Sequence, residues 1–272
     1  MKENYFKVLM IEDSRTFAQL ILEMIEDARG AEINLDHAFR LSTGLDLLSK
    51  DHYDVILLDL SLPDSIGLDT LRKVKEFAPE IPVVVMTSLD DEDTAARALQ
   101  TGAQDYLVKG DFDTNLLVRS LKYAIERKRA NDLLRESEQM LSAVFQEIPS
   151  LIAITTFKEG LFIDVNRAFE TITGYSRNEV LAHTLLDMAF FQSEQEREGF
   201  RKILKEHGFI QNMEITFRKK SGELITGLLS VRRLKLKGKE CLLSVFTDIT
   251  ERKRIEEHLK SLLELQSSGK KE

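Results

Sequence analysis

Short apolar runs alternate with helical periodicity through the first half of the chain. The strand-like runs cover residues 7–11, 32–38, 54–58, 81–86 and 105–108. After Ser14, apolar residues recur on one helical face, and further helices are expected at 43–48, 68–77, 94–99 and from Thr114 onward. Five successive strand–helix units predict an α/β domain with a five-stranded, doubly wound parallel sheet.

The pattern changes from Leu151 onward. Short strands are expected at 151–156 and 161–165, followed by a helical middle and three longer strands. Gly-containing segments at 220–223 and 237–239 are typical of hairpin turns, so the longer strands should pair antiparallel. The second half is therefore predicted to be a separate α+β domain.

A helical connector is expected between the two domains. Helix-forming residues continue past Arg127 to Phe145, without a Gly or Pro before Pro149. The expected divisions are a first domain at 1–127, a connector at 128–143, a second domain at 144–250 and a C-terminal helix with a polar tail at 251–272.

Charged and hydroxyl side chains stand at the ends of four predicted strands. Glu12 and Asp13 follow the first run, Asp59 follows the third, Thr87 the fourth and Lys109 the fifth. In an open parallel sheet, sites form at the carboxyl edge, so these residues should converge on one crevice. Each position alone could be a turn former or a helix cap. Five of them at successive strand ends favour a shared site.

This set of groups suits the acceptance of a phosphoryl group. Clustered carboxylates need a cation, and their oxygens suit Mg²⁺, which also binds phosphate oxygens. Asp59 could then attack phosphorus as a carboxylate nucleophile and form an aspartyl phosphate. Lys109 and Thr87 would neutralise charge on the transferring group.

At this point residues 5–127 resemble the receiver domain of bacterial two-component response regulators, whose fold is flavodoxin-like. The resemblance implies that Asp59 is the phosphoryl acceptor, that Thr87 and Lys109 assist it, and that Tyr106 is a switch residue. It also implies a donor, which would be a histidine kinase or a phosphotransfer protein. The implied Mg²⁺ ligands are Glu12, Asp13, Asp59 and the backbone carbonyl of Ser61.

Two positions depart from the receiver pattern. Gly110 follows Lys109 where the family commonly has Pro, often after a cis bond, so the isomer of this peptide bond is left open. Family precedent also gives Ser61 and Leu89 control over water access to the phosphoryl group. Because Leu89 cannot orient an attacking water by hydrogen bonding, the acyl phosphate is expected to hydrolyse slowly.

Residues 144–250 resemble a PAS domain, a five-stranded antiparallel sheet holding short helices. The resemblance rests on the segments 162–169, 173–181 and 248–252. PAS motifs are structural, so they leave the ligand unknown.

Neither haem nor flavin is supported by this sequence. Cys241 lies in a strand-like segment rather than in the helix motif of light-sensing flavin members, and is expected to be a small core residue. His183 and His207 could ligate haem iron by type, but each is expected at a helix end or on the surface. A small apolar ligand stays open, because ordinary hydrophobic residues would line its pocket.

Charge and cysteine usage narrow the class further. The net charge of −8 belongs to residues 1–130, which hold 16 basic and 24 acidic residues, and no basic face for nucleic acid is expected. A single cysteine, the lack of a long apolar run and an N-terminus unlike a signal peptide predict a cytoplasmic protein without a membrane span.

The expected function is a two-component response regulator rather than an enzyme acting on other substrates. Charged runs at 126–129 and 251–254 each lead into a leucine-bearing helix, which favours a homodimer. One alternative is a metal-dependent phosphohydrolase with Asp59 as nucleophile, although Ser61 stands where haloacid-dehalogenase-type enzymes place a second Asp. Another is the N-terminal part of a longer sensor histidine kinase. A DNA-binding regulator is disfavoured because no basic helix-turn-helix follows.

Overall fold

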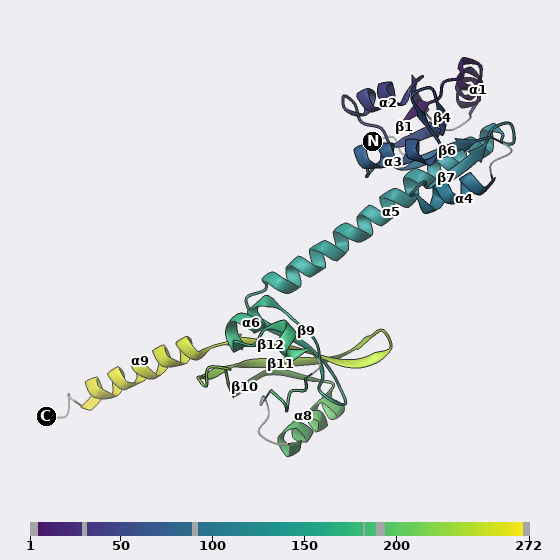
Figure 1. Cartoon of the computed structure of the whole chain (residues 1–272). Helices are drawn as coiled ribbons and strands as arrows, with labels where there is room; N and C mark the ends of the chain where they lie inside the picture. Colours follow the sequence, from purple (N-terminus) through teal and green to yellow (C-terminus); the bar gives the residue numbers. More distant parts are fainter. Residues whose placement is uncertain (1–4, 29–31, 89–91, 182, 189–193, 269–272) are drawn as a thin grey trace. The chain divides into compact units, whose positions relative to one another are not determined.

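The chain folds as two compact units, residues 1–136 and 137–272 (Figure 1). The computed structural model describes residues 5–28, 32–88, 92–181, 183–188 and 194–268. Among these residues, no helix is both long enough and apolar enough to cross a membrane.

The first unit is built on a parallel sheet with the strand order β2-β1-β3-β6-β7. Its strands are β1 (Tyr5–Ile11), β2 (Glu32–Ala38), β3 (Val55–Asp59), β6 (Val83–Thr87) and β7 (Asp105–Val108). Every neighbouring pair is parallel. The predicted doubly wound parallel sheet is therefore confirmed.

Helices cover both faces of this sheet. They are α1 (Arg15–Glu26), α2 (Leu41–Leu48), α3 (Leu68–Phe77), α4 (Glu92–Gln100) and α5 (Thr114–Glu147). Successive strand residues point to opposite faces, so Val8 and Met10 pack in the cluster that contains α1 and α5. Leu9 and Ile11 pack in the other cluster, with α2, α3 and α4. Both faces are apolar because both are covered.

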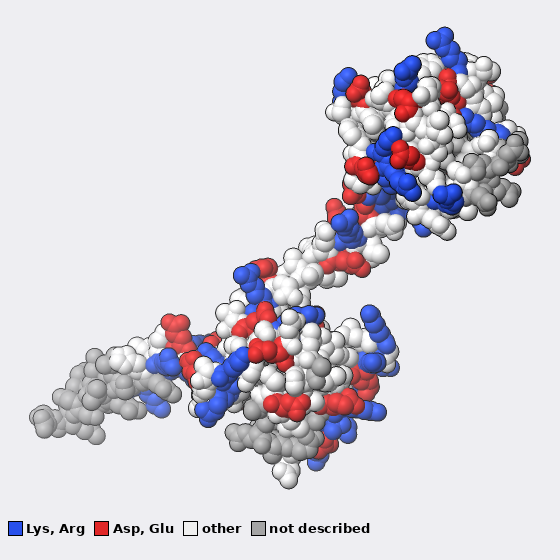
Figure 2. Space-filling view, viewed as in Figure 1, with Lys and Arg blue, Asp and Glu red and all other residues white. Residues whose placement is uncertain are grey.

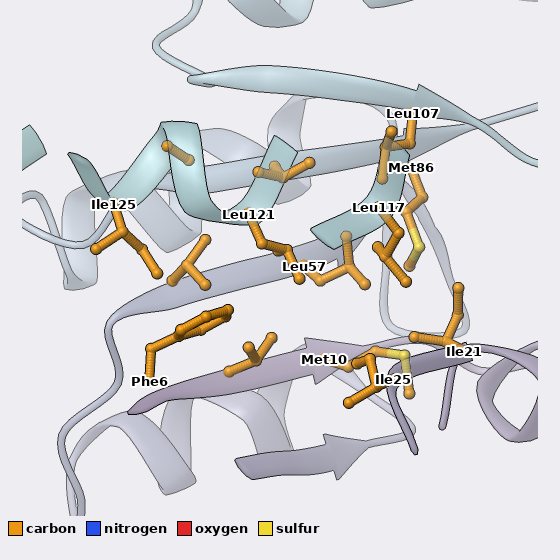
Figure 3. Close-up of a cluster of buried hydrophobic side chains, with 14 of the residues drawn as sticks. Phe6, Met10, Ile21, Ile25, Leu57, Met86, Leu107, Leu117, Leu121 and Ile125 are labelled. Carbon is orange, nitrogen blue, oxygen red and sulfur yellow. The ribbon is translucent and has the colours of Figure 1, made fainter. Parts of the chain in front are cut away.

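Helix α5 changes character along its length. Its first turns bury Leu117, Leu121 and Ile125 against the sheet core (Figure 3). Beyond residue 130 the apolar side chains are exposed, for example Leu134 and Leu141. The helix contains the expected connector 128–143 within one continuous element.

A small hairpin that the sequence pattern did not indicate follows β3. Strands β4 (Ser61–Leu62) and β5 (Ser65–Ile66) pair antiparallel. Two-residue strands are too short to produce a period, which is why the pattern missed them.

The second unit contains an antiparallel sheet with the strand order β10-β11-β12-β8-β9. Its strands are β8 (Leu151–Thr156), β9 (Phe162–Val165), β10 (Phe209–Arg218), β11 (Leu224–Leu236) and β12 (Lys239–Asp248). Its helices are α6 (Arg167–Thr173), α7 (Arg177–Val180), α8 (Glu194–His207) and α9 (Thr250–Ser268). This architecture confirms the predicted five-stranded antiparallel α+β fold.

The turn between β11 and β12 shows why the sequence makes a hairpin there. Lys237 and Gly238 have φ values of 48° and 79°. A two-residue turn with both central φ angles positive matches the twist of the flanking strands.

Candidate functional site

The predicted site residues lie at one edge of the parallel sheet. Glu12 and Asp13 follow the end of β1, and Asp59 and Thr87 are the last residues of β3 and β6. Lys109 follows β7, and its N–H donates to the carbonyl of Thr87 at 2.7 Å. Because all four strands run parallel, their carboxyl ends meet at the same edge.

The three acids form a compact cluster. Carboxylate oxygens of Glu12, Asp13 and Asp59 all lie within 4.8 Å of one another. Glu12 and Asp59 are buried, whereas Asp13 is exposed. Burial raises the pKa of the Glu12 carboxyl, and the neighbouring Asp59 charge raises it further. Three oxygen donors of this kind fit a hard divalent cation such as Mg²⁺.

Lys109 joins the two buried acids. Its Nζ lies 2.7 Å from Glu12 Oε2 and 2.9 Å from Asp59 Oδ2. Burial alone would lower the pKa of the Lys109 ammonium, but its hydrogen bonds to Asp59 and Glu12 outweigh burial and raise it. The ammonium therefore stays charged beside the Asp59 carboxylate.

Backbone groups and one aromatic ring hold these side chains in place. Ser61 N–H donates to Asp59 Oδ1 at 3.1 Å, and Ser14 N–H donates to Glu12 Oε1 at 3.1 Å. The ring of Phe17 lies 4.8 Å from Lys109 Nζ, a contact that adds cation–π attraction. Sequence reasoning missed Phe17, because its helical spacing marked it only as a core residue.

Thr87 and Tyr106 differ in exposure. Thr87 is buried, and its hydroxyl has no hydrogen-bond partner among the described residues. A buried hydroxyl without a partner costs free energy, so this group is available to a ligand at the site. Tyr106, on β7, is 39% exposed.

The loop after Lys109 contains no cis peptide bond among the described residues. Gly110 has a φ of 86°, a left-handed conformation that glycine adopts without strain. Leu89, which entered the expectation about hydrolysis, lies outside the described residues.

Asp64 has a structural role that the sequence did not indicate. Its carboxylate accepts hydrogen bonds from Leu41 N–H at 2.9 Å and Ser42 N–H at 3.0 Å. It thereby caps the start of α2 from the loop that follows Asp59. A cap supplied from a distant segment leaves no local sequence signal.

In the second unit, Asn166 and Cys241 are buried parts of the fold. Asn166 is fully buried and joins four backbone groups by hydrogen bonds. Cys241 is buried in β12. His183 and His207 are exposed, and neither lines the cavity that is bounded by Leu151, Phe169 and Phe246.

The comparisons with known proteins agree with this architecture. Residues 8–122 match the response regulator receiver domain, and residues 149–251 match the PAS domain. The chain carries a response regulator receiver domain followed by a PAS domain. Receiver domains accept phosphate from histidine kinases and bind Mg²⁺ at an acidic pocket, the position held here by Glu12, Asp13 and Asp59.

Similar proteins include regulatory proteins of several bacteria. Regulatory protein LuxO of Vibrio cholerae is 34% identical over 155 residues, which cover 52% of this chain and 32% of LuxO. Transcriptional regulatory protein DltR of Streptococcus agalactiae is 29% identical over 138 residues, 51% of this chain and 58% of DltR. The chain thus spans only about a third to three fifths of the length of these relatives.

Similar solved structures include a receiver domain protein and a PAS domain. A receiver domain protein from Clostridium thermocellum is 29% identical, with a TM-score of 0.42, and covers 46% of this chain and 98% of its own. The PAS domain of an HTR-like protein from Haloarcula marismortui is 21% identical, with a TM-score of 0.38, and covers 45% of this chain and 99% of its own.

Proposed function

We propose that this protein is a two-component response regulator that is phosphorylated on Asp59 by a histidine kinase or a phosphotransfer protein. The observation that carries the proposal is the Asp59 carboxylate, held by Lys109 at 2.9 Å and clustered with two other acids. Glu12, Asp13, Asp59 and the backbone carbonyl of Ser61 would hold Mg²⁺, which would neutralise charge on the phosphoryl oxygens.

Residues of the chain itself would carry out the other steps of phosphoryl transfer. Ser61 N–H holds one oxygen of Asp59. The other oxygen, now bound by Lys109, would attack phosphorus while the P–N bond to the donor's histidine breaks and the imidazole leaves. Lys109 would then transfer its contact to the phosphoryl group. The Thr87 hydroxyl would donate to a phosphoryl oxygen, and this movement would allow Tyr106 to turn inward.

Phosphorylation with a small donor tests the assignment. Acetyl phosphate with Mg²⁺ should add one phosphoryl group to the protein, and Asp59→Ala should abolish the addition, as measured by intact-protein mass spectrometry. Asp111→Ala is the matched control, because Asp111 is an exposed acid in the loop beyond Lys109. Unchanged labelling of Asp59→Ala would rule out Asp59 as the acceptor.

Turnover distinguishes the phosphohydrolase alternative. A response regulator should retain its acyl phosphate, whereas a phosphohydrolase should release inorganic phosphate from esters in many cycles. We expect a long-lived acyl phosphate, on the basis of Ser61 and Leu89. Decay within seconds at neutral pH would contradict this part of the proposal.

Helix α5 supports the further proposal of a homodimer. Leu133, Leu134, Met140, Leu141 and Val144 are each at least half exposed. At about 3.6 residues per turn, these five positions fall on one face of the helix. An isolated helix with such a face is marginal in water and gains stability by packing. Because α5 joins the receiver and PAS domains of each chain, pairing of two copies along α5 would also couple these domains in the dimer.

Light scattering with and without a beryllofluoride–Mg²⁺ phosphoryl mimic tests the dimer. Leu134→Lys with Leu141→Lys should lower the dimer fraction, because both side chains lie on the apolar face. Gln139→Lys is the control, since Gln139 is exposed on the opposite face. A monomer in both states at tens of micromolar would exclude the dimeric arrangement.

A further inference from the structure

The core of the PAS domain is divided around a cavity. One apolar cluster includes Leu151, Phe169 and Phe246, and a second includes Phe157 and Leu242. A cavity of about 340 Å³, which we call the PAS cavity, is lined by residues from both clusters. Close-packed interiors leave few voids larger than a water molecule, and small-ligand pockets span about 300–1000 Å³. The PAS cavity therefore has the size of a ligand site.

Most of the cavity wall is apolar. Its aromatic part consists of Phe157, Phe162, Phe169, Phe200, Phe217 and Phe246. Water in such a space needs two to four polar partners, and most of this wall offers none. An apolar molecule fits this part of the cavity better than water does.

One polar group in the wall is Thr155. This residue is only 1% exposed, and its hydroxyl has no hydrogen-bond partner among the described residues. It lies on β8 opposite Leu242 of β12, which also lines the cavity. A buried hydroxyl without a partner is costly, so a ligand atom at this position would stabilise the protein.

The other polar residues of the wall are Thr156, Glu214, Thr216, Ser244 and Arg201. Among them, the guanidinium of Arg201, on α8, supplies a positive charge. Its Nη1 lies 2.8 Å from Glu198 Oε2, and its centre lies 5.6 Å from the ring centroid of Phe157. Its Nε is shielded from solvent and has no hydrogen-bond partner among the described residues. Nε–H can only donate, and the guanidinium always carries charge, so its natural partner is an anionic acceptor.

Both groups line the cavity. Thr155 precedes Phe157 by two residues on the chain, and the Arg201 guanidinium lies over the Phe157 ring. We propose that the PAS cavity binds a small amphipathic monocarboxylate. Its carboxylate is bound by Arg201 and Thr155, and its apolar body lies against the phenylalanines. This inference is independent of the proposed phosphorylation.

Calorimetric titration of the full chain with octanoate and with octan-1-ol tests the proposal. These probes share an apolar chain and differ in the charge of the headgroup. Octanoate should bind about tenfold more tightly, because its headgroup accepts a charge-assisted hydrogen bond. Binding of neither probe, or equal affinity for both, would overturn the proposal, and this comparison needs no variant.

Variants assign the binding groups. Arg201→Gln should weaken octanoate binding about tenfold and leave octan-1-ol binding unchanged. Arg233→Gln is the matched control, because Arg233 also lies over the Phe157 ring, at 4.6 Å, but does not line the cavity. Equal octanoate affinity in the two variants would overturn the role of Arg201.

Two further variants test the location. Thr155→Val should weaken octanoate binding about fivefold. Ala153→Leu should fill the cavity and abolish the binding of both probes, since Ala153 lines it. Hydrogen exchange of β8 and β12 checks that each variant is folded. Full octanoate binding by folded Ala153→Leu would place the site elsewhere and overturn the proposal.

Discussion

The receiver and PAS domains each bury a threonine hydroxyl that has no hydrogen-bond partner among the described residues, Thr87 in one and Thr155 in the other. Thr87 ends a parallel strand beside the ion pair of Lys109 and Asp59. Thr155 lines a cavity whose wall is mostly apolar and includes six phenylalanines. A buried threonine hydroxyl thus lies beside charged groups in the receiver domain and beside an apolar cavity in the PAS domain.

The two surroundings imply different responses of the two domains to a signal. In the receiver, buried charges are already fixed in place, so a phosphoryl group would meet preorganised partners. In the PAS domain, the buried polar residue with the most hydrogen bonds, Asn166, holds backbone segments together. A ligand there would gain mainly from apolar contact.

The largest expected effect concerns Asn166. Its side chain accepts from the N–H groups of Ile152 and Phe169, at 2.9 and 3.0 Å, and donates to the carbonyls of Ile148 and Ser150, at 3.2 and 2.9 Å. Asn166→Ala should lower the free energy of unfolding of the PAS domain by about 3 kcal/mol or more, because it leaves buried backbone groups without their hydrogen-bond partner.

Urea denaturation followed by hydrogen exchange measures this effect domain by domain. The exposed Asn178→Ala serves as control and should change little. Phosphorylation of Asp59 should be unaffected in both variants. A loss of stability shared equally by the receiver would show that the two units do not unfold separately.

The two threonines provide a matched pair for the second prediction. Thr87→Val should slow phosphorylation by acetyl phosphate about 100-fold, because one hydroxyl donor to the developing charge is lost. Thr155→Val should leave that rate unchanged. Mass spectrometry of samples quenched at successive times gives both rates. Equal slowing in the two variants would contradict the different roles of the two hydroxyls.

The third prediction compares packing. A Cβ on Gly44 would lie 2.4 Å from Ile11 Cδ1, so Gly44→Ala should destabilise the receiver by about 1–2 kcal/mol, despite the better helix propensity of Ala. Ala153→Leu adds volume at the PAS cavity and should stabilise the PAS domain by about 1 kcal/mol. Urea midpoints of the two domains would show these opposite signs. A destabilising Ala153→Leu would mean that the cavity is already filled.

The sequence predicted the receiver sheet well because its signals are local. Each buried strand is a continuous apolar run, and the residue at its end is polar, as at Asp59 and Thr87. Parallel topology then brings these ends together without any further information.

The PAS cavity could not be predicted in the same way. Thr155 and Arg201 are ordinary residues of a strand and a helix, and both line the cavity only because these elements pack around it. The cap that Asp64 provides to α2 is likewise made across 23 residues of sequence. Periodicity indicates which face of an element is buried, but not whether the buried space is full.

The smallest expected effect concerns Glu179, an acid that supports the PAS fold. It differs in this from the acids Glu12, Asp13 and Asp59 at the edge of the receiver sheet. Glu179 accepts hydrogen bonds from Ser176 N–H at 2.8 Å and Ser176 Oγ at 2.9 Å, and pairs with Lys220. Lys220 first, then Ser176, lowers the pKa of Glu179 from 4.5 to about 2. A depressed folded-state pKa contributes stability above the unfolded value, and that contribution is lost as the pH falls from about 4.5 towards 2.

Glu179→Gln should therefore destabilise the PAS domain slightly at neutral pH, and its difference from the wild type should shrink below pH 4.5. The effect is small because the carboxylate is exposed and screened by salt. Urea midpoints across this pH range, with the exposed Glu206→Gln as control, measure it. A difference that grew towards low pH would reverse the sign and exclude the capping role.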